Sequence, residues 1–287
     1  MSFLDGKIPE EPFNLEKSFE EMAQSEEERT LKDYDGEDKI VYSYEVEAMV
    51  ASESDALYRI ESNYFPDLSK SIGGFIGGEV VVISGWSGHG KTLFTQSLTS
   101  DFAEQAVLGC WFSYEVTPYW FLKRFGSVVP VFLMPASMKA NSSNWIFERI
   151  KEAILKCGIK CVYIDHLHYI IDMMGNSRRN RSDEIGEVMR KLKVFALEQN
   201  IVIFLIAHTA KPKGGDADSL ELGSVRDSSF IEQEADTVLY VWRARDRLDG
   251  SFIKIAKDRK QGTLNKTIKL LKRRSYLMEA DLYGLEA

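Results

Sequence analysis

A glycine-rich loop between an apolar run and a helix-like segment carries the strongest chemical signal in the chain. Residues 85–92 read Gly-Trp-Ser-Gly-His-Gly-Lys-Thr, which fits the spacing G-x-x-x-x-G-K-[ST] in full. In this arrangement, backbone amides and the start of the following helix surround phosphate groups. Lys91 is then placed to reach the β- and γ-phosphates, and the Thr92 hydroxyl to bind Mg²⁺. The spacing predicts a nucleotide site whose loop residues are Ser87, Gly88, His89, Gly90, Lys91 and Thr92.

Two acidic residues each follow an apolar run with the length and composition of a buried strand. Asp165 ends the run KCVYID, and Glu115 comes two residues after the run GCWFS. We expect Asp165 to hold the Mg²⁺ water shell opposite Thr92, and Glu115 to polarise the water that attacks the γ-phosphate. Taken alone, either acid could equally be a helix cap or a solvated residue. Their positions after a phosphate loop favour the catalytic interpretation.

A histidine ends a third apolar run. His208 follows IVIFLIA, so it is expected at the end of a strand near the same loop. A polar side chain at that position could contact the γ-phosphate and register its presence. The alternative is a histidine that is merely hydrogen-bonded at the end of its strand.

The apolar runs that carry these residues belong to a longer alternation of strand-like and helix-like segments. Strands are expected at residues 79–84, 109–113, 160–164, 201–207, 237–242, 252–256 and 267–271. Helices are expected at residues 91–107, 147–157 and 181–199. Fully apolar strands alternating with helices predict an α/β fold, with a mainly parallel twisted sheet and helices on both faces. In such sheets, ligands bind at the carboxyl ends of the strands, where the loop and the three residues above fall.

Charge divides the chain into an acidic N-terminal part and a weakly basic remainder. Up to Glu61 the sequence has 18 acidic and 6 basic residues, a net charge of −12, whereas the rest has 26 acidic and 30 basic residues, net +4. We therefore expect residues 1–62 to be an acidic N-terminal extension or docking arm, and residues 63–287 to be the ATPase domain. The overall charge of −8 does not argue against nucleic-acid binding by the second part.

Composition excludes several classes of protein. The 287 residues are 44% hydrophobic and 28% charged, which is typical of a folded globular chain. No apolar run reaches the roughly 18 residues of a membrane-spanning helix, and the acidic start shows no export or organelle signal. The cysteines are too few for a disulfide framework, and structural thiols are favoured over a zinc site. We expect no membrane association and a reducing, cytoplasmic compartment.

Four segments after the loop carry a family resemblance. Residues 112–125, 160–170, 203–212 and 223–243 occur in this order, and together they resemble the hexameric replicative DNA helicases of the DnaB-like family. The last segment, GSVRDSSFIEQEADTVLYVWR, is the most specific. The resemblance covers about residues 63–275. It implies a RecA-like P-loop ATPase core, ATP or another nucleoside triphosphate with Mg²⁺ as cofactors, and the cytoplasm of a bacterial or phage-infected cell.

The resemblance assigns roles to the residues already singled out. Lys91 and Thr92 correspond to the nucleotide and Mg²⁺ ligands, Glu115 to the catalytic glutamate, and Asp165 to the Walker B aspartate. His208 falls where bacterial members usually carry glutamine. A histidine at that position resembles the phage and mitochondrial helicase branch.

It also adds three basic residues that spacing alone would not select. The segment KIAKDRKQG resembles the family's strand that supplies a basic pair to the neighbouring subunit. Arg259 then corresponds to the arginine finger and Lys257 to its companion. Arg124, in the segment after Glu115, is placed by the resemblance near the nucleotide base or phosphates.

In this architecture, two basic loops face the channel of the ring. One loop follows the Asp165 strand and the other follows the His208 strand. Basic side chains beside flexible glycines suit contact with a single-stranded backbone, without base readout. A polar exposed loop remains the alternative for either one. The candidate DNA contacts are Arg178, Arg179, Arg181, Lys211, Lys213 and Arg226.

The residues and the resemblance together predict an ATP-dependent replicative DNA helicase. It would form a homo-oligomeric ring, expected to be hexameric, that hydrolyses ATP at subunit interfaces, translocates on single-stranded DNA and unwinds duplex. A primase or another replisome protein is a further expected partner. Ser229 departs from the family, which often has glycine there, and the acidic extension stands where members carry helical, primase or zinc modules. Two alternatives stay open: a RecA- or clock-type ATPase that assembles without unwinding, and an ATP-binding adaptor or loader.

Overall fold

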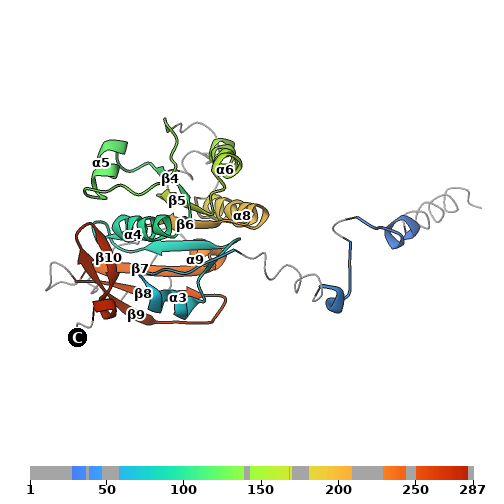
Figure 1. Ribbon diagram of the computed structural model, residues 1–287. Helices are drawn as coiled ribbons and strands as arrows, with labels where there is room; N and C mark the ends of the chain where they lie inside the picture. Colours follow the sequence, from blue (N-terminus) through green and yellow to red (C-terminus); the bar gives the residue numbers. More distant parts are fainter. Residues whose placement is uncertain are drawn as a thin grey trace, which may run out of the picture. The chain divides into compact units, whose positions relative to one another are not determined.

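The chain divides into two units, residues 1–55 and residues 56–287 (Figure 1). The computed structural model describes residues 28–36, 39–46, 58–138, 143–167, 169, 181–208, 229–243 and 250–283. In the first unit, residues 28–32 and 43–46 are helical. The division falls seven residues before the expected boundary at 62/63, because strand β1 (Arg59–Ile60) already pairs with β2 (Phe75–Ile76) of the second unit.

An eight-stranded sheet forms the centre of the second unit, in the order β10-β9-β8-β7-β3-β6-β5-β4. Strands β7, β3, β6, β5 and β4 are parallel, and β8, β9 and β10 continue the sheet as an antiparallel meander. The bounds are β3 (Val80–Ser84), β4 (Gly109–Ser113), β5 (Cys161–Asp165), β6 (Val202–Ile206), β7 (Thr237–Arg243), β8 (Gly250–Asp258), β9 (Lys266–Arg273) and β10 (Tyr276–Glu279).

Helices cover both faces of this sheet (Figure 1). The first face packs against α6 (Ser143–Cys157), α8 (Arg181–Gln199) and α9 (Ser229–Glu234). The opposite face packs against α3 (Pro66–Ile72), α4 (Lys91–Glu104) and α5 (Pro118–Lys123), and the short helix η2 (Ala280–Tyr283) ends the described chain. This is the two-sided α/β arrangement expected from the sequence.

The core explains why the central strands are apolar at every position. Successive side chains of a strand point to opposite faces, and here each face is buried under helices. Val80 and Val82 of β3 therefore belong to one apolar cluster, whereas Val81 and Ile83 belong to the other. Such a strand shows no alternation in sequence, because both of its faces are buried.

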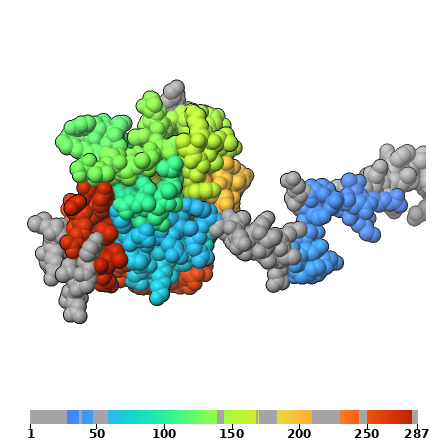
Figure 2. All heavy atoms as spheres, viewed as in Figure 1, coloured from blue at the N-terminus to red at the C-terminus, as the bar shows by residue number. Residues whose placement is uncertain are grey.

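The C-terminal strands pack directly against the helix that follows the glycine-rich loop. In the space-filling view of Figure 2, the red C-terminal segment lies against the blue to teal residues of α3 and α4. The backbone N–H of Leu277 donates to Ser97 Oγ of α4 at 2.8 Å. The N–H of Glu279 donates to the carbonyl oxygen of Tyr64 at 2.9 Å. Strand β10 is thus hydrogen-bonded to α4 and to Tyr64, which comes shortly before α3.

The three cysteines are free thiols, as their small number leads us to expect. Cys110 and Cys161 are buried in the core, and Cys157 is exposed on α6. Burial raises the pKa of the Cys110 thiol to about 12. Among the helices that the structure describes, none has the length and apolar character needed to span a bilayer.

Candidate nucleotide-binding site

The glycine-rich loop connects β3 to α4 in a conformation that glycine alone adopts without strain. Gly85, Gly88 and Gly90 have φ angles of +145°, +78° and +98°. A Cβ atom on Gly85 would lie only 2.2 Å from the carbonyl oxygen of Val241 in β7. Side chains are therefore excluded at this position by both backbone conformation and space. The loop wraps tightly at the carboxyl edge of the sheet, as the motif predicts.

Lys91 is the first residue of α4 and is buried against its own loop. Its Nζ donates hydrogen bonds to the carbonyl oxygens of Gly85 at 2.8 Å and Trp86 at 3.0 Å. Burial lowers the pKa of Lys91 to about 8, which Asp165 and Glu115 partly oppose. A phosphate group beside this ammonium would supply the negative charge that burial removes.

Asp165 and Thr92 meet across the loop, as expected of two ligands to one cation. Thr92 Oγ1 donates to Asp165 Oδ2 at 2.9 Å, and the aspartate is fully buried at the end of β5. Burial, reinforced by the charge of Glu115, raises the pKa of Asp165 to about 6. Within the described part of the chain, Asp165 Oδ1 has no hydrogen-bond partner. A hydroxyl and a carboxylate with one spare buried oxygen are oxygen donors of the kind that Mg²⁺ prefers.

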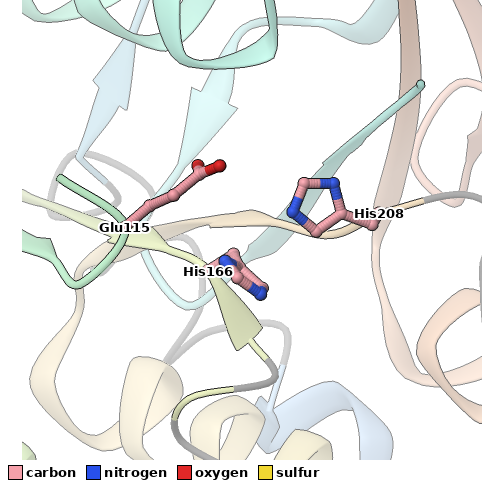
Figure 3. Close-up of side chains that lie close together, drawn as sticks. All are labelled: Glu115, His166 and His208. Carbon is pink, nitrogen blue, oxygen red and sulfur yellow. The ribbon is translucent and has the colours of Figure 1, made fainter. Parts of the chain in front are cut away.

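Glu115, His166 and His208 lie together beside this pair, at the ends of three neighbouring strands (Figure 3). The possible ligand atoms of the three side chains all lie within 4.8 Å of one another. The imidazole rings of His166 and His208 meet edge to face with centroids 4.5 Å apart. The sequence pattern indicated Glu115 and His208 as site residues, but not His166. Its position directly after Asp165, at a strand end, was the signal available.

A cavity of about 700 Å³ opens over the loop and gathers most of the expected nucleotide residues. Its wall includes Lys91, Thr92, Glu115, Arg124 and His208, so the structure brings Arg124 to the site as the resemblance implies. Four further basic residues, which the sequence did not reveal, also line it: Lys123, Arg243, Lys272 and Arg274. A cavity with several cations above a phosphate loop fits a polyanion.

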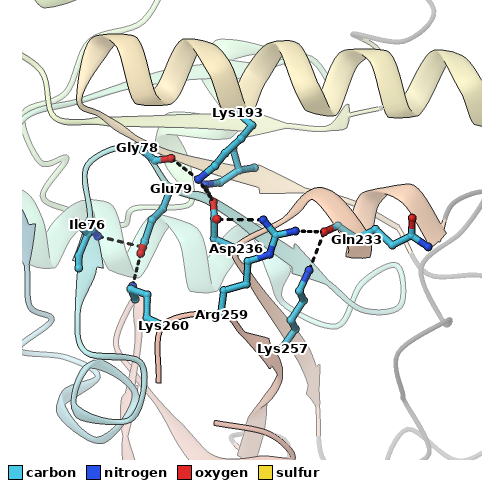
Figure 4. Close-up of polar contacts among 10 residues, drawn as sticks. Ile76, Gly78, Glu79, Lys193, Gln233, Asp236, Lys257, Arg259 and Lys260 are labelled. Atoms are coloured by element: carbon cyan, nitrogen blue, oxygen red, sulfur yellow. Dashed lines mark hydrogen bonds and ion pairs between the residues drawn. The ribbon is translucent and has the colours of Figure 1, made fainter. Parts of the chain in front are cut away.

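Lys257 and Arg259 do not line this cavity. They lie at the amino ends of the parallel strands, the edge of the sheet opposite to the loop, and Figure 4 shows their contacts there. The N–H of Arg259 donates to the carbonyl oxygen of Asp236, whose own N–H donates to that of Val80, the first residue of β3. The loop leaves the other end of β3, five residues further along. Because a parallel strand rises about 3.3 Å per residue, the two edges are about 16 Å apart.

Both basic side chains bond to the C-terminal end of α9 instead. Lys257 Nζ donates to the carbonyl oxygens of Glu232 at 2.6 Å and Gln233 at 2.9 Å, and Arg259 donates to that of Gln233. The Arg259 guanidinium also lies 3.6 Å from Asp236 Oδ1. Cations at a helix C-terminus are stabilised by the exposed carbonyls and the helix dipole. Arg259 remains exposed in this position.

Most of the expected DNA contacts lie outside the described residues. Arg181 is the first residue of α8, and only its backbone is described. The others, for which the structure gives no placement, are Arg178, Arg179, Lys211, Lys213 and Arg226.

Sequence comparison finds similarity to replicative DNA helicases. Residues 129–277, just over half of the chain, match the family model described as the DnaB-like helicase C terminal domain. The chain is 23% identical over 213 residues to a replicative DNA helicase DnaB of Geobacillus stearothermophilus, covering 62% of this chain and 46% of that protein. It is 31% identical over 108 residues to a probable plasmid replicative DNA helicase of Chlamydia psittaci, covering 37% and 23%. The matches thus span less than half of these curated relatives.

Solved structures share the fold of the second unit. A separately solved ATPase domain superposes with a TM-score of 0.71 at 17% identity, covering 85% of this chain and all of that one. A DnaB-like replicative helicase, solved to show its interactions with primase, superposes at 0.67 with 18% identity, covering 92% and 71%. These likenesses confirm the RecA-like α/β architecture.

Proposed function

Because the chain belongs to the DnaB-like helicase C-terminal domain family, we propose that it is an ATP-dependent DNA helicase that assembles into a ring. The observation that carries the proposal is the division of its charged residues between the two edges of one sheet. Lys91, Glu115 and His208 surround the loop, whereas Arg259 lies about 16 Å away at the far end of β3. In this proposal, each chain carries both parts of a catalytic site, but its own Arg259 lies too far from its own loop to complete that site.

At the loop edge, each residue has a task that follows from its position. Lys91 exchanges the carbonyl oxygens of Gly85 and Trp86 for the β- and γ-phosphate oxygens of ATP. Glu115 accepts the proton of the attacking water, and His208 contacts the γ-phosphate. Thr92 and Asp165 would hold Mg²⁺, which supplies neutralising charge to the phosphates when bound.

At the far edge, Arg259 would serve the site of a neighbouring chain, with Lys257 beside it. Both would leave the C-terminus of α9, where partly exposed hydrogen bonds now hold them. An arginine that meets the charge of the transition state contributes about 10³–10⁵ in rate. ATP hydrolysis would then depend on assembly, for which we propose a homo-oligomeric ring, hexameric as in the family resemblance.

Mixing two inactive variants tests whether the site is shared between chains. Arg259→Ala should bind nucleotide and lose nearly all ATPase activity, whereas Lys91→Ala should lose nucleotide binding. Mixed rings contain interfaces that join an intact loop to an intact Arg259, so the mixture should regain part of the turnover. No recovery at any mixing ratio would contradict a shared site, provided that native mass measurements show mixed assemblies.

We propose single-stranded DNA as the track of this motor, contacted by basic residues of the loops after β5 and β6. The double variant Arg178→Ala/Arg179→Ala should weaken binding to all single-stranded sequences alike. Each lost phosphate contact should reduce the slope of log affinity against log salt by about 0.7. An unchanged slope would show that these two arginines do not contact DNA.

Two outcomes of the same assays would point to the other classes of function. DNA-stimulated ATPase activity without unwinding of a fork would indicate a RecA- or clock-type ATPase. ATP binding without DNA-stimulated hydrolysis would indicate an adaptor or loader. A primase is a further proposed partner, and the cytoplasm of a bacterial or phage-infected cell is the proposed compartment.

A further inference from the structure

Three side chains beside the loop form a donor set that the proposed hydrolysis of ATP does not require as a set. Glu115, His166 and His208 offer one carboxylate and two imidazoles, with the ligand atoms within 4.8 Å of one another (Figure 3). Each comes from the end of a different strand, β4, β5 and β6, which are neighbours in the sheet. The sheet itself therefore brings the three donors together.

The chemistry of this set differs from that of the neighbouring Thr92–Asp165 pair. Mg²⁺ takes oxygen ligands in a strict octahedral arrangement, which a hydroxyl and an aspartate suit. Two imidazole nitrogens and one carboxylate suit Zn²⁺ and similar transition-metal ions instead, with a fourth position left for water. The two sites would thus select different cations although they share one cavity wall.

The geometry requires only small side-chain movements. At zinc–ligand distances of about 2.0–2.1 Å, donors around a tetrahedral ion lie about 3.4 Å apart. Glu115 is exposed and can change its side-chain torsions, whereas the His166 ring is held between His208 and Tyr169, whose centroid lies 4.9 Å away. Glu115 and His208 both line the cavity, so the fourth position of the ion would face open space.

We propose that Glu115, His166 and His208 bind one divalent cation of the zinc class, and that this ion blocks hydrolysis by occupying Glu115 and His208. The blocking effect rests on the proposed function, because it requires Glu115 to act on water. The binding itself does not. A bound ion would leave the Lys91 loop open to nucleotide and would remove the carboxylate that activates water.

Binding is tested by calorimetric titration of Zn²⁺ into the full chain, without nucleotide and with Mg²⁺ in excess. We expect one equivalent of Zn²⁺ to bind, and we expect His166→Ala or His208→Ala to weaken it at least about ten-fold. His166→Gln serves as a milder variant, with circular dichroism to show that each protein is folded. The controls His168→Ala, Cys157→Ser and Thr92→Val should bind Zn²⁺ like the unaltered chain.

An affinity that is unchanged in the folded His166 variants would overturn the site. So would an affinity that depends on His168 or Cys157 in place of His166. In the second arm, Zn²⁺ should inhibit ATP hydrolysis at constant Mg²⁺, and His166→Ala should raise the half-inhibiting concentration at least about ten-fold. If the unaltered chain hydrolyses no ATP, the proposed function fails while calorimetry still decides the metal site. If hydrolysis proceeds and no Zn²⁺ binds, this inference fails alone.

Discussion

The two charged residues buried at the phosphate loop reduce the stability of the folded chain. Asp165 is fully buried with its pKa raised to about 6, and burial lowers the pKa of Lys91 to about 8. Each shift favours the neutral form, whereas cation and phosphate binding require the charged form. Keeping Asp165 and Lys91 charged therefore destabilises the folded chain, and binding of a cation and a phosphate would offset that loss of stability.

Asp165→Asn should therefore stabilise the chain at neutral pH while removing a Mg²⁺ ligand. Below about pH 3, the carboxyl holds its proton in both states. As pH rises from about 3 to 6, the unfolded chain loses this proton first, so the unaltered protein loses stability. The difference approaches at most about 3 kcal/mol above pH 6, from the shift between 3.8 and about 6.

Urea unfolding at pH 4 and pH 7 measures this effect. The free energy of unfolding of Asp165→Asn, relative to the unaltered chain, should be larger at pH 7 than at pH 4. Asp281→Asn alters an exposed carboxylate and should change the free energy by less than about 0.5 kcal/mol. A relative stability of Asp165→Asn that does not vary with pH would contradict the burial argument.

Among the elements, the loop between β3 and α4 depends on glycine for two different reasons. Gly85 combines a φ of +145° with contact against β7, because its Cβ would lie 2.2 Å from the carbonyl oxygen of Val241. Gly88 has a φ of +78°, but no atom of the residues that the structure describes lies within 4 Å of its Cβ position. The first position is limited by both conformation and space, and the second by conformation alone.

Comparing Gly85→Ala with Gly88→Ala separates the cost of the backbone conformation from the cost of the missing space. Gly88→Ala should lower the free energy of unfolding by about 1–2 kcal/mol, the cost of a left-handed backbone. Gly85→Ala should lower the free energy of unfolding by about 1–3 kcal/mol more than Gly88→Ala does, because strand β7 must move to admit the methyl group. If urea unfolding showed the same loss of free energy for both variants, Val241 would be able to move away from the added methyl group without destabilising the chain.

The elements that the sequence predicts best are those whose burial is uniform. The fully apolar strands β3 to β7 appear within two residues of their expected bounds, and α8 spans the expected residues 181–199. Strands β1, β2 and β10 were not predicted, since they are short and only partly buried. Helices α3, α5 and α9, of six or seven residues, give too little periodicity to detect.

The site residues that belong to a sequence motif were predictable, whereas those that long-range strand pairing brings to the site were not. The spacing of the loop and the strand ends predicted that Lys91, Asp165 and Glu115 lie near one another. In the structure, Lys91 and Glu115 line one cavity, and Asp165 accepts a hydrogen bond from Thr92 of the same loop. Lys272 and Arg274 belong to a basic stretch that resembles a solvated face in sequence. They reach the cavity because β9 runs parallel to β3 within the sheet, and only long-range strand pairing determines that.

At the scale of the whole molecule, the two-unit division predicts that residues 56–287 fold without the acidic extension. Both apolar clusters lie within these residues. The free energy of unfolding per chain should therefore match that of the full protein within about 0.5 kcal/mol. Urea unfolding at a concentration where both proteins are monomeric measures it.

A start at residue 63 provides the matched comparison, because it removes Ile60 and Ser62. Ile60 is buried in the core, and Ser62 Oγ donates to the buried carboxylate of Asp101. Their loss should lower the stability of the 63–287 chain by at least about 2 kcal/mol relative to 56–287. Equal stabilities of the two shortened chains would move the boundary back to residue 62.

The placement of the loop and Arg259 at opposite edges of one sheet limits how copies of this chain can join. If the loop end of one chain meets the Arg259 end of the next chain, the chains associate head to tail. Each chain then gives a guanidinium to one neighbour and receives one from the other. Such heterologous contacts close into a ring if the rotation permits and otherwise wind into a filament. In either case the assembly has two unlike ends, so a DNA strand inside it would meet them in a fixed order.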